Sequence, residues 1–589
     1  MADSDNQSRF PDLPPGLQTL TPQSSSGTMV GADPSRVWPL EPMPVIEISL
    51  TTPAFPSATT LAHEAEDIPR PHKPVMPILN GKNSELTQPA PPQLRDSEEI
   101  AWDDPQDQAN PQNWSEGRKW LITATCVIMA INVTFASSAP TSAVQAIQVH
   151  FHLSPEVSYL VTFTFLVGYV LGPFVWGPGS ELLGRRPTLI FAMSIYTLLY
   201  IPQALAPNIE TLLTTRFLCG FFGVAPLVSC GGVLADVWSA EKRGLPMSTW
   251  SASVFLGTIL GPIVAGFIVD SGSLNWRWVF WVGMIFAGAC TLFTACFLPE
   301  TYAPVILLRK VKERRRVDPE GGQWLYAAHE KEDWSALGIV KRTLFRPFIM
   351  LSEELILVLV TLYICLIYGV MYMLFEALPI IFIEKHGFTI SLNGLIFIGV
   401  GIGTVLGALS THFLATDYPQ LIKLWRGFPP PEERLRAAML GAPVFVIGIF
   451  WLGWTGEYTS IPWYLPALST IPVGFGISAI FISFLSYLID TYLMFAASAF
   501  AANTVARSLV AGRSQLFTVQ MFDKMGVGYA CTLLGGVGLL LAPMPFLFFR
   551  YGARVREGSR WAPGMDLKVK KQIEEEKIAR RSERRRRNE

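Results

Sequence analysis

The sequence predicts an all-α integral membrane protein with twelve transmembrane helices in two six-helix halves. Three observations support this fold class: a low charged content, apolar runs of membrane-spanning length, and an uneven distribution of basic residues between those runs. Of the 589 residues, 50% are hydrophobic and only 16% are charged, against about 25% in an average soluble domain. The net charge of −1 gives no overall basic field, which argues against nucleic acid as a partner.

Residues 1–118 differ from the rest of the chain in composition. They hold 19 of the 45 prolines and many Ser, Thr, Asp and Gln, without a sustained apolar period. Such a segment cannot bury enough apolar surface to form a core. We therefore expect a disordered, cytoplasmic N-terminal tail over 1–118.

Apolar runs near the 20-residue length that crosses a bilayer recur from Trp120 onward. We expect spans at about 120–140, 157–177, 187–206, 211–235, 247–269, 278–298, 355–383, 393–415, 437–456, 463–489, 492–515 and 526–549. The seven cysteines all fall within these apolar regions, without the spacing of a zinc site or a disulfide framework. They are expected to be unpaired packing residues.

Basic residues give the spans a direction. The loops expected inside the cell carry eighteen Lys and Arg, whereas the outer loops carry only Arg277, Lys385 and Lys524. Because cytoplasmic loops hold the excess of basic residues, both termini are expected in the cytoplasm. The predicted order is a six-helix half, a cytoplasmic central loop, a second six-helix half and a basic cytoplasmic C-terminal tail, over 119–298, 299–352, 353–550 and 551–589.

The sharpest motif lies between spans two and three. Residues 177–187 read GPGSELLGRRP, in which glycines permit a tight turn and fixed charges stand at a helix end. This segment resembles the loop 2–3 signature of the major facilitator superfamily, Gly-x-x-x-Asp-x-x-Gly-Arg-Arg/Lys. Here Glu181 replaces the usual aspartate, and Leu182 stands where many members carry arginine.

Further segments resemble the drug:proton antiporter branch of that superfamily. Residues 216–223, RFLCGFFG, are similar to its fourth-span motif, and Gly257-x3-Gly261-Pro262-x3-Gly266 is similar to its fifth-span motif, although Ala265 replaces a usual glycine. Segments around 113–115, 299–304, 430–435 and 501–508 are typical of fungal multidrug and polyamine transporters. The resemblance covers about 110–560 and implies a proton-coupled exporter. Glycines four apart also permit close helix packing, which alone could explain the fifth-span motif.

Two arginines fall within predicted spans. An arginine there costs roughly 2.5–3.5 kcal/mol on insertion scales, so it is retained where it pairs or faces a wet cavity. Arg216 either ties helices together or, as the resemblance implies, shifts the protonation of a nearby carboxylate. Asn503 and Arg507 share one face of span eleven, where substrate contact and inter-helix bonding remain open. With Glu376 and Tyr169, these residues form the predicted proton-coupling and substrate site.

A cytoplasmic gate is predicted where charges meet at the ends of spans two to five. We expect Asp236 and Glu241 to contact Arg185 and Arg186 when this gate closes. The predicted gate residues are Gly177, Glu181, Gly184, Arg185, Arg186, Asp236, Glu241 and Arg243. Arg513 and Gln515 occupy positions where relatives usually have small or apolar residues, and they are expected either to reach the outer surface or to alter the substrate range.

The leading functional hypothesis is a proton-coupled exporter of amphipathic organic molecules, with small-molecule substrate, protons and the bilayer as partners. The chain is expected to be a monomer in the plasma membrane, with the vacuole as an alternative, and to need no cofactor or metal. Its rivals are a polyamine transporter, which should need carboxylates in its cavity, and a membrane sensor derived from a transporter. No cluster of His, Asp or Ser marks a reaction centre, so an enzyme is not expected.

Overall fold

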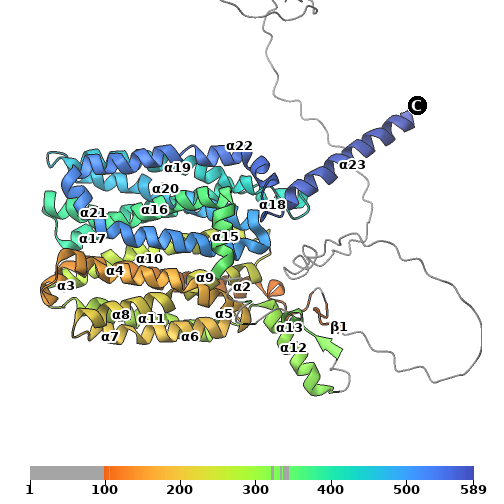
Figure 1. The fold of residues 1–589 in the computed structure, drawn as a ribbon, viewed down its shortest axis with the longest axis horizontal. Coiled ribbons are helices and arrows are strands. Elements are labelled where there is room, and N and C mark those ends of the chain that lie inside the picture. Colours follow the sequence, from red (N-terminus) through yellow and green to blue (C-terminus); the bar gives the residue numbers. More distant parts are fainter. Residues whose placement is uncertain are drawn as a thin grey trace, which may run out of the picture. The chain divides into compact units, whose positions relative to one another are not determined.

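A computed structural model describes residues 98–104, 106–239, 241–319, 324–331, 335, 338 and 344–588. The described residues belong to one compact unit, and they are almost entirely helical. The expected tail over 1–97 lies outside the described residues. Figure 1 shows the long helices running side by side, with the first six spans in orange to yellow and the later spans in green to blue.

The first half contains the elements up to α11. Their bounds are η1 Pro111–Asn113, α2 Glu116–Ser138, η2 Ala139–Ala143, α3 Val144–Phe151, α4 Pro155–Leu171, α5 Pro173–Leu182, α6 Arg185–Leu198, α7 Tyr200–Ala204, α8 Ile209–Gly223, α9 Ala225–Val237, α10 Gly244–Asp270 and α11 Arg277–Phe297. Proline follows directly at the start of α5 and near the start of α9, where its missing N–H costs no helical hydrogen bond. Spans two and four are therefore each built from two helices.

The second half contains the elements from α15 onward. Their bounds are α15 Arg346–Glu353, α16 Leu355–Pro379, the π-helical turn η5 Ile380–Lys385, α17 Ile390–Leu414, α18 Tyr418–Leu424, η6 Pro431–Leu435, α19 Arg436–Glu457, α20 Tyr464–Tyr492, η7 Leu493–Phe495, α21 Ala496–Leu541, α22 Met544–Glu557 and α23 Met565–Asn588. Gly526 has a φ of 77° inside α21, and glycine is the residue that tolerates this conformation. α21 is thus two helices that meet at Gly526.

The described helices are consistent with twelve spans. Within the described part of the chain, ten stretches are long and apolar enough to cross a membrane, and the pair α4 and α5, bent by 42°, makes an eleventh. One of the ten, Ala496–Glu557, has 62 residues. At about 1.5 Å per residue it is long enough for two crossings, and it is broken at Gly526.

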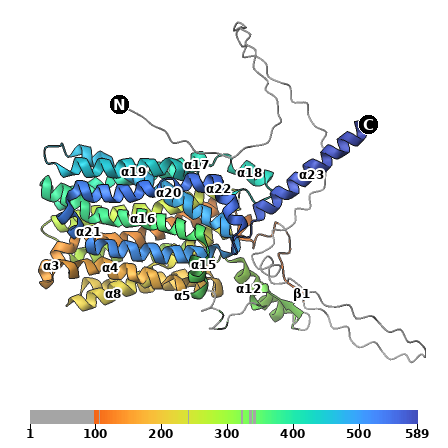
Figure 2. The same ribbon diagram turned by 45° about the horizontal axis from the view of Figure 1, so that its top comes forward.

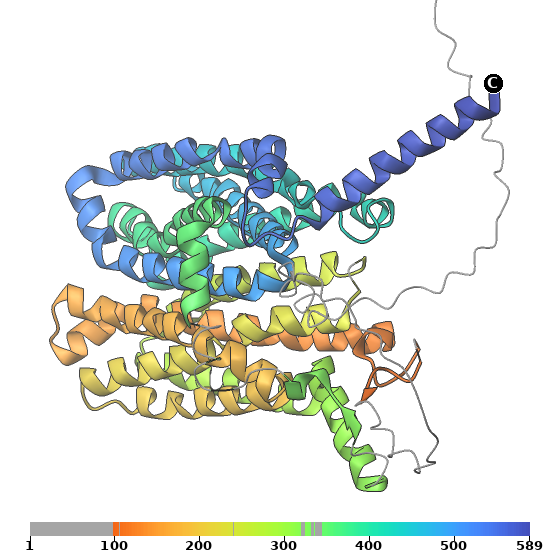
Figure 3. The ribbon, with the colours of Figure 1, turned by 45° about the vertical axis from the view of Figure 1, so that its right-hand side comes forward.

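The two halves touch along two pairs of helices, α10 with α17 and α4 with α21. Figure 2 and Figure 3 show the two colour groups packed along their length. At these contacts, Gly394 of α17 lies against the backbone of Pro262, and Gly512 of α21 lies against Phe163 of α4. A contiguous cluster of buried apolar side chains runs through both halves.

The structure moves one expected boundary. Within the segment 98–118, which composition assigned to a disordered tail, β1 (Glu98–Glu99) pairs in parallel with β2 (Leu325–Tyr326). Ile100 is buried with Val311 of α12 (Ala303–Val317) and Ala327, which precedes α13 (Ala328–Lys331). The central loop thus carries the structure that orders this part of the tail. The polar composition of the segment did not predict this contact, because only one apolar residue of the segment takes part in it.

The C-terminal tail also has structure. The basic segment 551–589 contains the end of α22 and all of α23. Arg556 is almost fully buried and pairs with Glu432 at 2.8 Å and Asp566 at 2.6 Å. This network fixes the start of α23 against the second half.

Candidate functional site

Arg216 of α8 lies fully buried inside the first half and joins three helices. Its Nε donates to the carbonyl of Val161 on α4, and its Nη1 donates to the carbonyl of Ala136 on α2, both at 3.0 Å. In a regular helix the Ala136 carbonyl would accept from residue 140, but Pro140 has no N–H. Arg216 therefore satisfies a carbonyl that α2 leaves without a partner, while its own Nη2 is buried without a hydrogen-bond partner among the described residues. Its guanidinium also lies 4.2 Å from the ring centre of Phe165.

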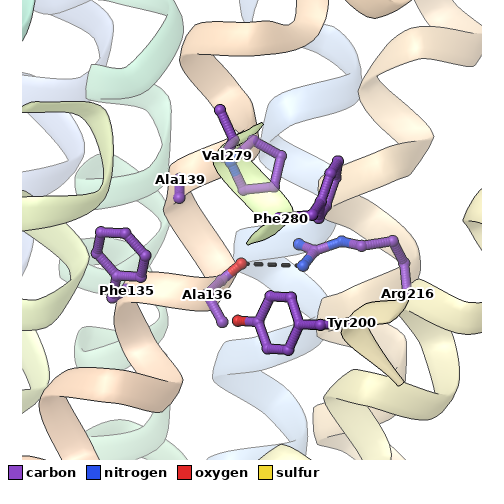
Figure 4. Close-up of a pocket in the computed structure, with 8 residues that line it drawn as sticks. Phe135, Ala136, Ala139, Tyr200, Arg216, Val279 and Phe280 are labelled. Carbon is purple, nitrogen blue, oxygen red and sulfur yellow. Dashed lines mark hydrogen bonds between the residues drawn. The ribbon is translucent and has the colours of Figure 1, made fainter. Parts of the chain in front are cut away.

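The recess beside Arg216 is small. Figure 4 shows the bond from Arg216 to Ala136 with Tyr200 and Phe280 close by. The recess leaves no room for a molecule the size of water, whereas usual ligand pockets enclose ~300–1,000 Å³. All of its lining residues belong to the first half, and no described carboxylate lies within ion-pair distance of Arg216. Arg216 therefore connects α8 to its neighbours α2 and α4.

Tyr169 belongs to the same packing. Its hydroxyl donates to the carbonyl of Val133 at 3.0 Å, and its ring lies 5.0 Å from that of Phe165. Both contacts stay within the first half. Tyr169 thus supports the environment of Arg216, and it also interacts electrostatically with Tyr368 and Tyr372 of the second half.

Arg507 of α21 is equally deep, with 3% of its surface exposed, but its surroundings differ. Its hydrogen bond from Nη2 to Thr504 Oγ1 is 3.5 Å long. The Nε and Nη1 atoms are buried without a hydrogen-bond partner among the described residues. The guanidinium carbon instead lies near three aromatic rings: Tyr368 at 4.8 Å, Phe481 at 5.1 Å and Phe500 at 6.0 Å.

This aromatic cage borders the interface between the halves. Phe255 of α10, from the first half, lies 6.3 Å from the Tyr368 ring and 4.8 Å from the Phe481 ring. One turn along α16, the Tyr372 hydroxyl is hydrogen-bonded to Ser137 of α2 at 2.9 Å. Arg507 stands eleven residues into α21, about 16 Å from its start. Duplicated transporters bind their substrates at such interfaces, near mid-membrane.

Other polar atoms near the middle of α21 lack partners as well. Asn503 donates to Thr361 Oγ1 at 3.3 Å, but its Oδ1 is buried and unbonded within the described residues, as are both amide atoms of Gln515. Arg513 is exposed instead. Of the two unusual residues in this span, Gln515 is the one directed into the protein.

Glu376 of α16 is half-buried and has no ion pair or hydrogen bond to another described residue. It interacts electrostatically with Tyr159 of α4, in the opposite half. The structure thus places this carboxylate near the interface between the halves, apart from Arg216.

The fifth-span glycines act at close helix contacts. Gly257 lies against Thr134 and the Ile131 carbonyl of α2, and Gly261 lies against Ser138. Gly266 faces α17, where an added side chain would meet the Ile390 carbonyl at 3.0 Å. α10 continues through Pro262. This motif therefore brings α10 close to both its own half and the other one.

A charged cluster lies where α5 ends and α6 begins. The Nε of Arg185 pairs with Asp236 at 3.3 Å, and its Nη1 donates to Ser180 at 2.6 Å. Its guanidinium carbon lies 4.8 Å from the Tyr302 ring centre, and Glu181 interacts with it electrostatically. The predicted contact between Arg185 and Asp236 is present.

Glu300, after α11, completes this cluster, although it was not among the gate residues predicted from the sequence. Its carboxylate accepts from the backbone N–H groups of Arg185 at 2.9 Å and Arg186 at 3.3 Å, as expected for an anion at a helix N-terminus. Gly184 has a φ of 100°, and any side chain there would collide with this carboxylate. An acid directly after span six was the signal in the sequence.

Three predicted gate residues are arranged differently. Glu241 is exposed and has no contact with Arg185 or Arg186 among the described residues, because it lies in the loop beyond the end of α9. The Arg186 side chain donates to the Ala295 carbonyl at 3.1 Å. Gly177 has an open neighbourhood, where an added side chain would meet only Val228, at 3.8 Å.

The second half holds a matching cluster at the same end of the helices. Arg434 pairs with Asp490 at 2.8 Å, the Tyr418 hydroxyl donates to Asp490 at 2.6 Å, and the guanidinium carbon lies 3.6 Å from the Tyr418 ring centre. Arg243 interacts electrostatically with Asp490 and with Asp236 of the first half. Burial lowers the pKa of Arg243, and its Nε has no hydrogen-bond partner among the described residues.

A family model described as the Major Facilitator Superfamily matches residues 125–514. The chain belongs to the major facilitator superfamily. It is 40% identical over 468 residues to an ascochitine biosynthesis cluster transporter from Didymella fabae, covering 79% of this chain and 89% of that relative. It is 41% identical over 466 residues to a citrinin biosynthesis cluster transporter from Monascus ruber, covering 79% and 92%.

A solved structure of the proton:xylose symporter XylE shares the fold, with a TM-score of 0.55 at 17% identity, over 74% of this chain and 96% of the symporter. The resemblance drawn from the sequence motifs is thus confirmed. This major facilitator protein is a multi-pass membrane transporter for small organic molecules. The duplicated fold explains why Asp236, at the end of span four, has a counterpart in Asp490, at the end of span ten.

Proposed function

We propose that the protein is a proton-coupled secondary active exporter of amphipathic small organic molecules, working by alternating access of its two halves. The observation that carries this proposal is the aromatic cage around Arg507, with its unbonded donors, beside Phe255 of the opposite half. A site at this interface is uncovered to one side or the other as the halves rock. Relatives named for biosynthesis clusters of small metabolites support this substrate range.

The clusters around Arg185 and Arg434 form the cytoplasmic gate in this proposal. Each half carries its own arginine–aspartate pair, and Arg243 extends from the first half toward Asp490. Closing this end brings the two clusters together, and opening it separates Arg243 from Asp490. The basic loops then face the cytoplasm, as do both termini. We place the monomeric protein in the plasma membrane, with the vacuolar membrane as the alternative.

A polyamine carrier is disfavoured by the charge between the halves. Polyamines are cations, and a site for them needs carboxylates, whereas the buried charged group of the cage is Arg507. Like charges in a region of low dielectric constant repel strongly. A purely sensing role is excluded if a pH gradient drives accumulation of the probe in the following experiment.

Glu376 is the proton carrier in this proposal. It lacks an ion pair among the described residues and lies near Tyr159 of the opposite half, so a change in its protonation can couple to rocking. With full-length protein in proteoliposomes, a pH gradient should drive accumulation of an amphipathic fluorescent probe. Glu376→Gln should abolish this driven flux and retain probe exchange at equal pH on both sides.

The matched control is Glu210→Gln, which neutralises an exposed carboxylate in the first turn of α8 and should leave the driven flux unchanged. Flux in the wild-type protein that ignores the pH gradient would contradict proton coupling. An intact driven flux in Glu376→Gln would contradict the role of Glu376 alone.

A further inference from the structure

Arg507 is a buried cation that rests against aromatic faces. Among the described residues no carboxylate lies within ion-pair distance of its guanidinium. Cation–π contacts offset part of the loss of hydration, but they leave the N–H donors unused. Guanidinium carries five N–H groups, and those at the Nε and Nη1 positions have no partner within the described part of the chain. Such donors are normally satisfied when buried.

We infer that Arg507 binds an anionic group of the substrate, so that the transported class is amphipathic organic acids in their ionised form. This inference rests on the proposed export function and specifies its substrate. The planar guanidinium fork matches a carboxylate with two parallel hydrogen bonds. A bound anion supplies the missing counter-charge and uses the free donors in one step.

The walls of the site suit the apolar body of such an acid. Tyr368 and Phe481 present ring faces on the second half, and Phe255 presents one from the first half. Aromatic rings favour offset or edge contacts with another ring at these distances. The unbonded Oδ1 of Asn503 and hydroxyl of Tyr368 can accept or donate one further hydrogen bond to the substrate.

Access to the guanidinium is tied to the motion of the halves. Phe255 covers the Tyr368 and Phe481 rings across the interface. When α10 moves away from α16 and α20, this cover is removed and the cage opens. An anion therefore reaches Arg507 only in the open state, and its binding favours that state over the closed one.

The test compares three probes that share one ring system: 1-naphthoate, 1-naphthylmethanol and 1-naphthylmethylammonium. Binding to the full-length protein in nanodiscs is measured by calorimetry at pH 7, where the acid is ionised. The wild-type protein should bind the acid at least about tenfold more tightly than the alcohol, because a charged pair adds to the same apolar contacts. The ammonium probe should bind most weakly.

Arg507→Met should weaken binding of the acid by at least about 30-fold and change binding of the alcohol by less than about threefold. Arg507→Lys should restore part of the affinity for the acid, since it returns the charge without the fork. Arg513→Met removes an exposed arginine from the same helix and should change neither affinity.

The inference is overturned if the wild-type protein does not prefer the acid, or if Arg507→Met binds the acid as the wild-type protein does. The wild-type preference decides the matter even if a variant folds poorly. Transport separates this failure from that of the proposed function. If a pH gradient drives transport of the alcohol without preference for the acid, only the inference is wrong. If it drives transport of none of the probes, the proposed function is wrong too.

Discussion

Arg216 and Arg507 are both buried inside the membrane-spanning part of the molecule, yet their surroundings are opposite. Arg216 donates to carbonyls of two neighbouring helices within one half. Arg507 makes a long hydrogen bond to Thr504 and lies among aromatic rings at the interface between the halves. The Nη2 of Arg216 also lacks a partner among the described residues, so the contrast lies in the backbone carbonyls that accept from Arg216. A buried arginine is structural where such carbonyls depend on it, and available to a ligand where the protein uses almost none of its donors.

The largest expected effect comes from replacing the arginine that donates to backbone carbonyls of two neighbouring helices. Arg216→Met leaves the Ala136 carbonyl without a donor, because Pro140 cannot replace it. Loss of two charge-assisted hydrogen bonds in an apolar interior should lower the free energy of unfolding by about 2–4 kcal/mol. Thermal unfolding of the purified protein in detergent measures this loss.

Arg507→Met is the counterpart, and it should change the free energy of unfolding by less than about 1 kcal/mol, since replacing an unpaired buried charge by an apolar group removes a desolvation cost. If both variants lose the same stability, the contrast between the two arginines is wrong, because Arg507 would then also hold neighbouring helices together. The contrast is supported if Arg216→Met is unstable while Arg507→Met keeps its stability and loses only its preference for acids.

Arginines that pair with carboxylates form an intermediate case. Asp236→Asn and Asp490→Asn each remove the partner of a partly buried arginine, which should cost about 1–2 kcal/mol of closed-state stability. Transport rates should fall about 5–30-fold, and a thiol reagent should reach an engineered cysteine in the inner cavity more readily. Unchanged transport and accessibility in both variants would contradict the gate. Glu116→Gln, which breaks only an exposed pair with Lys242, is the control.

The sequence predicted the spans, the two six-helix halves and the position of both arginines within spans, because apolar length and basic loops are local signals. It also predicted the pair Arg185 and Asp236, since both residues stand at span ends on the same side. The contrast between the arginines could not be predicted, because it depends on which helices face each other. One part of the contrast could be predicted from the sequence: Pro140, four residues after Ala136, indicates that the Ala136 carbonyl lacks its helical donor.

The matching pair in the second half was also within reach. Asp490 ends span ten as Asp236 ends span four, and Arg434 precedes span nine as Arg185 precedes span three. Duplication predicts that such positions share a role. Glu300 and the pairing of Glu98 and Glu99 with β2 were harder, because each depends on a contact between segments far apart in the sequence.

The smallest expected effect concerns partly exposed charges outside the membrane-spanning helices, where burial adds little to the pairing. Lys310 of α12 pairs with Asp103 at 2.6 Å and Asp107 at 3.1 Å. Its hydrogen bond lowers the pKa of Asp103, while the N–H of Ala109 and then Lys310 lower that of Asp107.

Because the folded pKa values lie below the unfolded value of about 3.9, the contribution is fully present above that pH and is lost as pH falls through the lowered values. We therefore expect hydrogen exchange at Ile100, whose N–H is bonded to Tyr326, to show constant protection from pH 8 to 5 after correction for intrinsic rates. Lys310→Met should reduce this protection slightly. The effect of the substitution should be smaller at high salt, where the ion pairs are screened. Lys312→Met, which removes an exposed neighbouring charge, should not reduce the protection. A large loss in Lys310→Met would mean that this pairing stabilises the segment as strongly as burial does, contrary to the order of effects argued from Arg216 downward.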